Sequence, residues 1–400
     1  MPHNRLRYLN KLLVERLKYS PIVGVLGHRQ VGKTTLVSSL SKEYASLDRA
    51  PLLNAARLQP ESFLENRAKP FAIDECQLAP ELFPELKEKV RTSKQSGQFI
   101  LTGSVRFTSR KAIRESLTGR IINLELLPMT LAEMNQAPLP NTLPQIMKSG
   151  FSHFKGVVLS PSKIKAIQNE LQRYCISGGL PGIAFTRKNE IRASQFDSHL
   201  ETVLIRDLPL VMATKLDSVR LYQILRILAR NQGRPTRIAD LQRECRVARP
   251  TLVNLIQALE ALFLLRILPT DGGPKASSFF FEDVGLATHL AGEPLGDEVN
   301  LIRCLYANLR EQFHYRPELN GEFFVYRKHS GASVPLAVRS KQGILGIIPT
   351  IDLHASRSNL LCAQSFLKAY PAAKVVIAHS GTTAEALTSQ IAALPWPALL

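Results

Sequence analysis

The sequence predicts an α/β protein whose amino-terminal part is a parallel sheet, followed by a helical lid, a winged helix and a smaller α/β domain. The apolar run at 22–26 is short enough to be a buried strand, and apolar residues from 36 to 40 repeat at helical spacing. Two further short apolar runs, at 71–73 and 99–101, each lead into polar side chains. Short strands that alternate with helical segments are typical of a parallel sheet.

The loop between the first strand and the first helix reads Gly27-His28-Arg29-Gln30-Val31-Gly32-Lys33-Thr34-Thr35 and fits the pattern G-x-x-x-x-G-K-T. Its two glycines let successive backbone N–H groups face one anion, and the helix that follows adds its positive amino-terminal end. Lys33 can reach the β- and γ-phosphates of a nucleotide, and Thr34 can place its hydroxyl on Mg²⁺. These residues are the candidates for nucleotide binding, against the alternative of a glycine-rich turn without a ligand.

Length and charge constrain the class of partner. A chain of 400 residues has room for two or three domains, and 51 Lys and Arg against 33 Asp and Glu give a net charge of +18. This surplus favours a polyanion, nucleic acid before an acidic membrane surface, although a basic surface kept for solubility fits as well. Five scattered cysteines, together with the lack of a signal peptide or a membrane-length apolar run, predict a cytoplasmic protein without structural zinc.

Two carboxylates follow the second apolar run. Asp74 and Glu75 come directly after Phe71-Ala72-Ile73. Downstream of a phosphate loop, Asp74 is suited to hold Mg²⁺ and Glu75 to polarise an attacking water. Thr102 and Ser104 follow the third run, where a small hydroxyl can sense the γ-phosphate or orient the water. The alternative for the acidic pair is a solvated turn.

Two arginines are candidates for further contacts with phosphate. Arg120, after Leu117-Thr118-Gly119, can supply the positive charge that phosphoryl transfer needs, or be tied to a nearby carboxylate as a structural residue. Arg206 can contact phosphate from the lid, or form a local ion pair with Asp207. Thr214-Lys215-Leu216-Asp217 matches a guanine-reading motif, but no strand leads into it. We interpret it as a helix start, which favours ATP over GTP.

In their order, these motifs resemble the bacterial and archaeal AAA-type ATPases of the AAA_14/DUF4143 group. The resemblance includes three later stretches: Ser177-Gly178-Gly179-Leu180-Pro181, Arg206-Asp207-Leu208 and Phe280-Phe281-Glu282-Asp283-Val284-Gly285-Leu286. It covers most of the chain up to Leu290. It implies ATP and Mg²⁺ as cofactors, and an ATP-binding domain of the additional-strand type followed by a helical lid, a winged helix and a nuclease-like domain.

The expected domains are a P-loop core at 1–140, a helical lid at 141–215, a winged helix at 216–270 and a nuclease-like domain at 271–400. Prolines 138, 140 and 144 mark the first boundary. Apolar residues at helical spacing over 221–228 and 252–262, then the apolar run 263–268, are typical of a winged helix-turn-helix.

The winged helix offers candidate contacts with DNA. The positions expected to be exposed gather near the amino end of its third helix, and they are Arg243, Arg246, Arg249, Thr251 and Asn254. That end meets base edges when such a unit docks in a major groove, and arginines there also neutralise phosphates. The alternative is packing against the rest of the protein, because winged helices in such ATPases also serve as packing modules.

The last domain departs from the pattern of an active nuclease. The resemblance implies acids that bind Mg²⁺ and a lysine that stabilises charge on the scissile phosphate. In that pattern a Glu lies on a helix, an acidic residue on a strand, and a Glu-x-Lys follows. Here the helix position holds Asn300, the strand position holds Ser333-Val334-Pro335-Leu336, and Ile351-Asp352-Leu353 replaces the Glu-x-Lys. Asp352 alone cannot hold a catalytic metal cluster, so we expect a nuclease-like scaffold without nuclease activity.

Two functional hypotheses follow. The first is a Mg-dependent ATPase in which Lys33, Glu75 and Arg120 act in catalysis and Thr34 and Asp74 hold the metal, and whose nucleotide state is passed to the winged helix. The second is an ATP-gated DNA- or partner-binding module with little turnover. A structure-directed nuclease is a third hypothesis, which the missing acids oppose. A homo-oligomer, and a neighbouring subunit as the source of an arginine, stay open.

Overall fold

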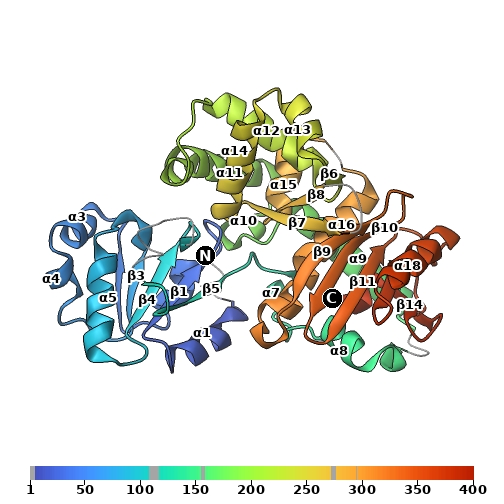
Figure 1. Cartoon of the computed structure of the whole chain (residues 1–400), viewed down its shortest axis with the longest axis horizontal. Coiled ribbons are helices and arrows are strands. Elements are labelled where there is room, and N and C mark those ends of the chain that lie inside the picture. The colour runs from blue at the N-terminus through green and yellow to red at the C-terminus, as the bar shows by residue number, and fades with distance from the viewer. Residues whose placement is uncertain (1–4, 108–116, 155–157, 272–275, 294) are drawn as a thin grey trace.

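The computed structural model describes residues 5–107, 117–154, 158–271, 276–293 and 295–400. Its elements form three lobes (Figure 1). One is a parallel sheet with its helices, the second is a group of helices around α12 (Ser218–Asn231), and the third is a sheet that carries the carboxyl terminus. Within the described residues, no helix has the length and apolar character needed to cross a lipid bilayer.

The first sheet holds five parallel strands in the order β2-β3-β4-β1-β5. The strands are β1 (Ile22–Leu26), β2 (Glu43–Ser46), β3 (Phe71–Asp74), β4 (Phe99–Gly103) and β5 (Ile121–Glu125). Because they run the same way, their carboxyl ends meet at one edge, and β4 lies between β1 and β3. The predicted α/β class with a parallel amino-terminal sheet is confirmed.

Helices pack on both faces of this sheet. They include α1 (Leu9–Leu17), α2 (Lys33–Ser38), α3 (Ala50–Leu58), α4 (Pro60–Leu64) and α5 (Leu82–Ser93). Ile22 and Val23, adjacent in β1, belong to two different apolar clusters, one on each face. Every residue of β1, β3 and β4 is buried. This two-sided burial explains why these strands are continuous apolar runs in the sequence rather than alternating ones.

The second sheet is mixed, with the order β13-β14-β12-β11-β10-β9-β7-β8-β6 over the described part of the chain. Its strands are β6 (Pro235–Thr236), β7 (Leu265–Asp271), β8 (Ser277–Phe281), β9 (Glu322–Arg327), β10 (Ser333–Ser340), β11 (Gly343–Pro349), β12 (Lys374–His379), β13 (Glu385–Ala386) and β14 (Ile391–Pro395). β7 pairs antiparallel with β8 and parallel with β9. The β7–β8 hairpin is thereby continuous with the carboxyl-terminal strands.

The helical lobe has the element order of a winged helix. The chain runs α12, β6, α13 (Ile238–Cys245), α14 (Arg249–Ala261), β7 and β8, with β6 and β7 on either side of β8. β7 ends at Asp271, and β8 belongs to the same hairpin. The hairpin therefore crosses the boundary that the sequence analysis placed between residues 270 and 271.

The range 141–215 does not form one lid. Its α-helices are α8 (Thr142–Ser149), α9 (Pro161–Ser177), α10 (Pro181–Ala184) and α11 (Asn189–Thr202). Other helices of the chain, outside this range, are α7 (Leu131–Met134), α15 (Val284–Ala291), α16 (Asp297–Leu309), α17 (Glu311–His314) and α18 (Arg357–Ala369). α8 and α9 share an apolar cluster with α16 and the second sheet. α10 and α11 instead share a cluster with the first lobe. The part of the expected lid that faces the first sheet is therefore its second half.

A disulfide joins α9 to α16. It links Cys175 to Cys304, which are 129 residues apart in the sequence. Nothing in the spacing of the cysteines indicates this bond. It fixes α9 to the carboxyl-terminal lobe, in agreement with the apolar cluster that the two helices share.

A buried set of charges links the lobes. Arg266 of β7 lies between Glu125 at the end of β5 and Glu282 after β8, with its Nε 2.8 Å from Glu282 Oε1. Arg310, between α16 and α17, also donates to Glu282. Burial alone would raise the pKa of Glu282, but the charges of Arg266 and Arg310 lower it overall. Glu282 therefore carries a charge that two arginines from different elements neutralise.

Glu282→Gln should destabilise the protein, because Arg310 then loses its buried carboxylate partner and Arg266 keeps only its pair with Glu125. We expect a loss of about 3–5 kcal/mol in the free energy of unfolding, measured by circular dichroism in urea. Glu293→Gln is the matched control, because its pair with Arg230 is exposed and should contribute less than about 1 kcal/mol. Equal unfolding midpoints for the two variants would contradict the structural role of Glu282.

Candidate functional site

The loop at 27–35 leaves the carboxyl end of β1 and enters α2. Gly27 has φ +152° and Gly32 has φ +101°, a backbone conformation that residues with side chains rarely adopt. A Cβ on Gly27 would lie 2.4 Å from the carbonyl oxygen of Leu126, just after β5. Glycine is therefore needed for the loop to run this close to its neighbouring strand.

The ammonium group of Lys33 lies inside this loop. Its Nζ donates to the carbonyl oxygens of Gly27 and His28, both at 2.9 Å, and the side chain is buried. Burial lowers the pKa of Lys33, while the carboxylates of Glu75 and Asp74 act in the opposite direction. The amine is thus held where the loop curls, between backbone carbonyls and two nearby carboxylates.

Asp74, at the end of β3, is surrounded by hydroxyl groups. Its Oδ2 accepts from Thr34 Oγ1 at 2.7 Å and from the Tyr44 hydroxyl at 2.6 Å, and its Oδ1 accepts from Thr102. A carboxylate beside a threonine hydroxyl is an oxygen donor set that suits Mg²⁺, which takes its other ligands from phosphate and water. The described residues contain no cluster of three or more His, Cys, Asp or Glu side chains arranged for a metal. The residues present therefore fit a nucleotide-bound Mg²⁺.

Glu75 follows Asp74 with φ +55°, and its side chain lines a cavity next to the loop. Its Oε2 accepts from Ser104 Oγ at 3.2 Å and from the side-chain amide of Gln77. Its backbone N–H donates to Thr102 Oγ1 at 3.1 Å. Thr102, near the end of β4, and Ser104, just after this strand, therefore hold both carboxylates in position.

The cavity beside the loop has a volume of 1110 Å³. Its lining combines Lys33, Glu75 and the start of α2 with residues of the amino-terminal segment and of α10–α11. Of the predicted nucleotide-binding residues, those in its lining are Gln30, Gly32, Lys33, Thr34 and Thr35, whereas His28 and Val31 are buried beneath it. Leu6, Ile183 and Phe185 give part of the lining an apolar surface. A lining that holds both a cation and apolar groups suits a phosphorylated ligand with a flat apolar part.

α11 and the turn after it contact the loop directly. Nε2 of His199 lies 3.2 Å from Nε2 of His28, and Nδ1 of His199 lies 3.1 Å from Oε1 of Gln30. Arg29 donates to the Asp207 carboxylate at 3.2 Å. Burial lowers the pKa of His28 well below its usual value and that of His199 to about 4, so both rings are neutral at pH 7. The lid and the loop are thus joined by a neutral histidine pair and an ion pair.

Arg206 pairs with Asp48, which follows β2, and not with its neighbour Asp207. The expected local ion pair between Arg206 and Asp207 is wrong. The π-helical turn Val203–Asp207 carries both residues, and their side chains reach partners on different parts of the first lobe. Arg206 does not line the cavity, and its contact with phosphate stays a prediction.

Arg120 lies at the opposite end of the sheet from the loop. It precedes β5, whose first residue, Ile121, pairs with Ile22 at the amino end of β1. The loop begins at the other end of β1, about 15 Å away at the usual rise of a strand. Arg120 Nη1 makes a long hydrogen bond of 3.4 Å to the Thr118 carbonyl. Within one chain, the predicted catalytic role of Arg120 is therefore wrong.

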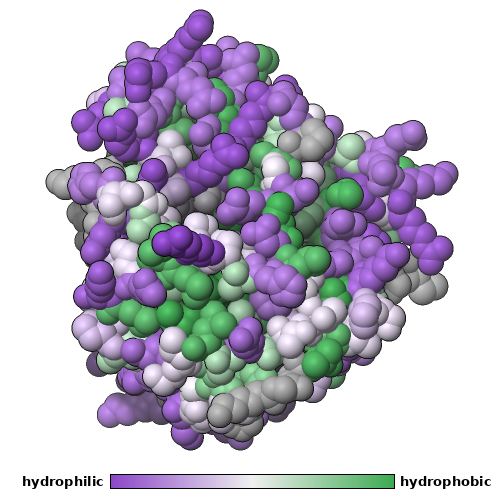
Figure 2. Space-filling view, turned by 90° about the vertical axis from the view of Figure 1, so that its right-hand side faces the viewer, coloured by the Kyte–Doolittle hydropathy of each residue, from purple (hydrophilic) through white to green (hydrophobic). Residues whose placement is uncertain are grey.

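The candidate DNA contacts gather at the turn between α13 and α14, at the top of Figure 1. The exposed ones are Arg243, Arg246, Arg249 and Asn254, and Thr251 is partly exposed. Arg243 also pairs with Asp240, one turn earlier in α13. Figure 2 shows that hydrophilic side chains cover the top of the molecule, where this lobe lies. These positions are accessible, and their contact with DNA stays a prediction.

The positions compared with a nuclease do not form a site. Asn300 in α16 donates to the carbonyl of Leu295 and accepts from Arg303. Ser333–Leu336 lie at the start of β10, and Asp352 comes after β11 rather than within it, where it accepts from Thr350. Neither β10 nor β11 contains a carboxylate. The residues at these three positions do not fit a catalytic metal.

Several residues of the site were not among the sequence candidates. Tyr44 is on an edge strand and belongs to no motif, and His199 lies in a helix that has little amphipathic pattern. Arg7 is buried, pairs with Glu133 at 3.0 Å and donates to the Val31 carbonyl at 2.7 Å. An arginine embedded in an amphipathic amino-terminal helix pattern gives no sign of such burial. Only the folded chain brings these residues to the loop.

His199→Gln should reduce the pH dependence of stability. The folded protein holds His28 and His199 at pKa values below the ordinary 6.5, so protonation favours the unfolded state. Their contribution is complete above the unfolded pKa of 6.5 and is lost as the pH falls toward about 4, the folded pKa of His199. In thermal melts over this range, the midpoint of the wild type should fall more steeply than that of His199→Gln.

The matched control for this measurement is His329→Gln, since His329 is exposed. Its midpoint should follow that of the wild type at each pH. A wild-type slope that is equal to the slope of His199→Gln would show that the histidine pair does not titrate as its burial requires.

Comparison with known proteins agrees with this geometry in the first lobe. Residues 19–135 match the family model of an AAA domain, and residues 168–295 match a domain of unknown function, DUF8612, rather than the DUF4143 group named above. Two uncharacterised proteins, from Mycobacterium bovis and Mycobacterium tuberculosis, are each 26% identical over 285 residues, a match that covers 69% of this chain and 57% of each relative. The chain thus spans little more than half the length of these relatives.

Among solved structures, a Walker-type ATPase of Pyrococcus abyssi is similar with a TM-score of 0.39 and 16% identity, over 70% of this chain and 94% of that one. The family match at 19–135 covers the sheet, the loop and the two carboxylates described above. Residues 19–135 therefore form an AAA-type P-loop domain, a nucleotide-binding domain of the ATPase type.

Proposed function

We propose that this chain binds ATP with Mg²⁺ in the cavity beside the loop and hydrolyses it to ADP and phosphate. The observation that carries the proposal is the hydrogen bond of 2.7 Å between Thr34 and Asp74, which unites the loop and β3 in one set of oxygen ligands. Lys33, in the same loop, and Glu75, on the cavity wall, supply a phosphate-binding cation and a base.

Each residue has a separate task in this reaction. The backbone N–H groups of the loop and Lys33 bind the β- and γ-phosphates, and Lys33 exchanges its two carbonyl partners for phosphate oxygens. Thr34 and Asp74 hold Mg²⁺, which neutralises charge on the phosphates when bound. Glu75 orients a water and takes its proton while the water oxygen bonds to the γ-phosphorus and the bond to the ADP oxygen breaks.

The contacts between the loop and the lid can transmit a change in bound nucleotide to the rest of the chain. Arg29 lies in the loop, and Asp207 in the π-helical turn holds its guanidinium group. A triphosphate in the loop competes with Asp207 for Arg29, because both are anions. The turn also packs against α12, the first helix of the winged helix. We infer that release of Arg29 from Asp207 changes the position of the turn and, through it, of α12.

The second candidate function is an ATP-gated contact with DNA. The specific observation in its favour is the exposed pair Arg246, which ends α13, and Arg249, which begins α14, in a chain with a net charge of +18. Neither arginine has a carboxylate partner among the ion pairs of the described residues. Helix ends of this kind meet base edges or phosphates when they dock in a major groove.

Lys33→Ala and Glu75→Gln should separate binding from hydrolysis. Lys33→Ala removes the cation that meets the phosphates and should weaken ATP binding about tenfold or more, measured by isothermal titration calorimetry. Glu75→Gln keeps the shape of the side chain but cannot accept the proton, so it should bind ATP as the wild type does. Its turnover, measured as phosphate release with Mg²⁺, should fall about 100-fold or more.

Glu81→Gln is the matched control, because Glu81 is an exposed carboxylate near the same strand end. It should leave both ATP affinity and turnover unchanged. If Glu75→Gln retains the turnover of the wild type, Glu75 is not the base. If the wild type binds ATP but shows no turnover in the presence of Mg²⁺, with or without DNA, the binding-module hypothesis replaces the ATPase.

Arg246→Gln and Arg249→Gln should weaken binding to double-stranded DNA if the winged helix contacts phosphates. Each should reduce the slope of log affinity against log salt by about one, measured by fluorescence anisotropy. Arg357→Gln, an exposed arginine at the start of α18, is the matched control and should leave the slope unchanged. DNA affinity equal to that of the wild type in both arginine variants would assign this face to packing or to another partner.

A further inference from the structure

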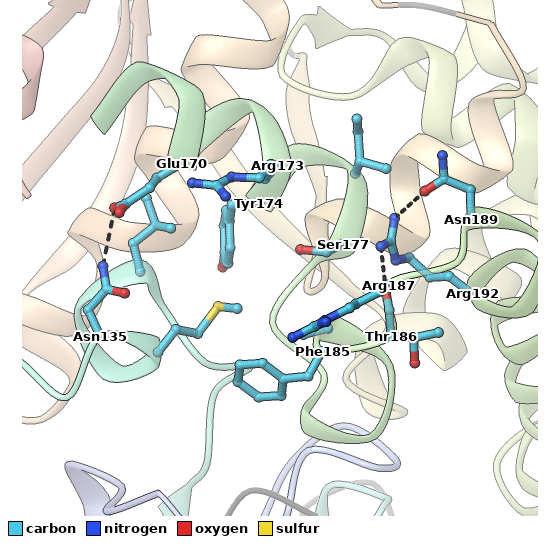
Figure 3. Close-up of a pocket in the computed structure, with 14 residues that line it drawn as sticks. Asn135, Glu170, Arg173, Tyr174, Ser177, Phe185, Thr186, Arg187, Asn189 and Arg192 are labelled. Atoms are coloured by element: carbon cyan, nitrogen blue, oxygen red, sulfur yellow. Dashed lines mark hydrogen bonds between the residues drawn. The ribbon is translucent and has the colours of Figure 1, made fainter. Parts of the chain in front are cut away.

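A second cavity, of 630 Å³, is drawn in Figure 3, and it shares Phe185 and Thr186 with the lining of the first. Its walls come from α7, from the carboxyl-terminal half of α9 and from the segment 184–192 that leads from α10 into α11. No residue of the loop at 27–35 lines it. The proposed reaction at the loop therefore leaves this cavity without an assigned role.

Arginines dominate the charge of this cavity. Arg173, Arg187 and Arg192 line it with a single carboxylate, Glu170. Glu170 accepts from the side-chain amide of Asn135 at 3.2 Å, a hydrogen bond within the wall that is drawn in Figure 3. Three guanidinium groups against one carboxylate leave the lining with a surplus of positive charge, which favours an anion.

Two of these arginines have donors to spare. No hydrogen bond or ion pair from the Arg187 guanidinium group occurs among the described residues, and Figure 3 shows its side chain crossing the space between Ser177 and Phe185. Arg173 uses its Nε on the Asn169 carbonyl at 3.3 Å, which leaves its Nη groups for a ligand. Planar guanidinium donors of this kind bind carboxylate or phosphate oxygens in pairs.

Arg192 has a different place in the cavity. Its Nη1 donates to Asn189 at 3.0 Å and its Nη2 to the Thr186 carbonyl at 2.5 Å. Its Nε is buried without a partner, and burial lowers the pKa of Arg192. An anion nearby would offset this cost of burial while the segment 184–192 keeps its shape.

The rest of the lining is largely apolar. Leu131 and Met134 of α7 line the cavity together with Phe185, and so does Ile176 of α9, half of whose surface is exposed. Anion-binding arginines above an apolar wall suit a ligand with an acidic head and a hydrophobic body. A fully hydrated ion such as inorganic phosphate would use only the arginines.

The two cavities share a wall. Phe185 and Thr186 line both of them. Arg5, from the nucleotide cavity, lies over the Phe185 ring at 4.7 Å and donates to the Met134 carbonyl. Thr186 also donates to Gln195, at 2.8 Å, in the lining of the nucleotide cavity. A ligand that binds to the segment 184–192 and shifts it therefore also shifts residues that line the first cavity.

We propose that the second cavity is an effector site for a small amphipathic anion, a carboxylate or phosphomonoester with an aromatic or aliphatic body, and that its occupancy changes nucleotide affinity. Arg187 and Arg173 bind the acidic head, and Phe185, Leu131 and Met134 contact the body. The effect on nucleotide affinity rests on the proposed function of the first cavity. Binding to the second cavity does not.

The first experiment measures binding to the full chain without nucleotide, by isothermal titration calorimetry. The probes are hydrocinnamate and phenyl phosphate, with hydrocinnamyl alcohol and inorganic phosphate as controls that lack the charge or the body. Both amphipathic anions should bind, and each control should bind about tenfold more weakly or not at all, because it loses either the charged hydrogen bonds or the apolar contact. Failure of both anions to bind at millimolar concentration, or equal binding of the alcohol, would overturn the proposal.

The matched variants are Arg187→Gln and Arg357→Gln. Both residues are exposed, so neither change should alter the thermal midpoint, which is checked first. Arg187→Gln should weaken hydrocinnamate binding about tenfold, whereas Arg357→Gln should not change it. Arg173→Gln is an independent second variant and should give a similar loss. Unchanged affinity in both cavity variants would place the probe elsewhere and overturn the proposal.

The last experiment tests the effect on nucleotide affinity. The affinity for a fluorescent ATP analogue is measured with and without saturating hydrocinnamate, in the wild type and in Arg187→Gln. We expect a change of about fivefold or more in the wild type, and none in the variant at the same concentration of probe. If the anion binds but nucleotide affinity does not change, the coupling is wrong. If the nucleotide itself does not bind, the proposed function of the first cavity fails while the calorimetric result for the second stands.

Discussion

The backbone of the loop between β1 and α2 is the constraint on which the rest of the site depends. Gly27 passes so close to the Leu126 carbonyl that no side chain fits there, and Lys33 fills the curl of the loop with its ammonium group. Three other segments of the chain contact the loop. Arg7 holds it from the amino-terminal segment, Asp74 from β3, and the lid holds it through His199 and Asp207. A loop held in this way has few independent movements, so a ligand that shifts it must act on its neighbours as well.

Two sets of contacts connect the first lobe to different parts of the chain. The contacts with the lid are few and polar, an ion pair and a neutral histidine pair, and they end at a π-helical turn that packs on α12. Such contacts exchange partners easily when a triphosphate competes for the arginine. The other link, through Glu125, Arg266 and Glu282, is buried and joins β5 to the β7–β8 hairpin. Arg310 also pairs with Glu282, so that two arginines match the two carboxylates, which suits a permanent junction between lobes rather than a movable one.

Much of the first lobe could be predicted from the sequence, because its signals are local. The spacing of Gly27, Gly32 and Lys33 fixes the loop, and the two carboxylates stand at the end of an apolar run that both faces of the sheet bury. The contacts that complete the site are not local. Tyr44 and His199 reach it from an edge strand and from a helix without a clear apolar face. Arg120 is a residue that the sequence wrongly assigned to the site. Its residue type and the motif before it suggested a catalytic arginine, but it lies at the end of the sheet opposite the loop. The hairpin of β7 and β8 likewise belongs to two lobes at once, a pairing that no linear boundary describes.

Hydrogen–deuterium exchange of the full chain, with and without a non-hydrolysable ATP analogue and Mg²⁺, tests the central claim most directly. If the loop holds the triphosphate and the lid responds to it, amides at 27–36 become protected and exchange at 199–207 changes in the same experiment. Lys33→Ala then shows neither effect. Protection that appears elsewhere, or a loop whose exchange is the same with and without the nucleotide at saturating concentration, would contradict the account.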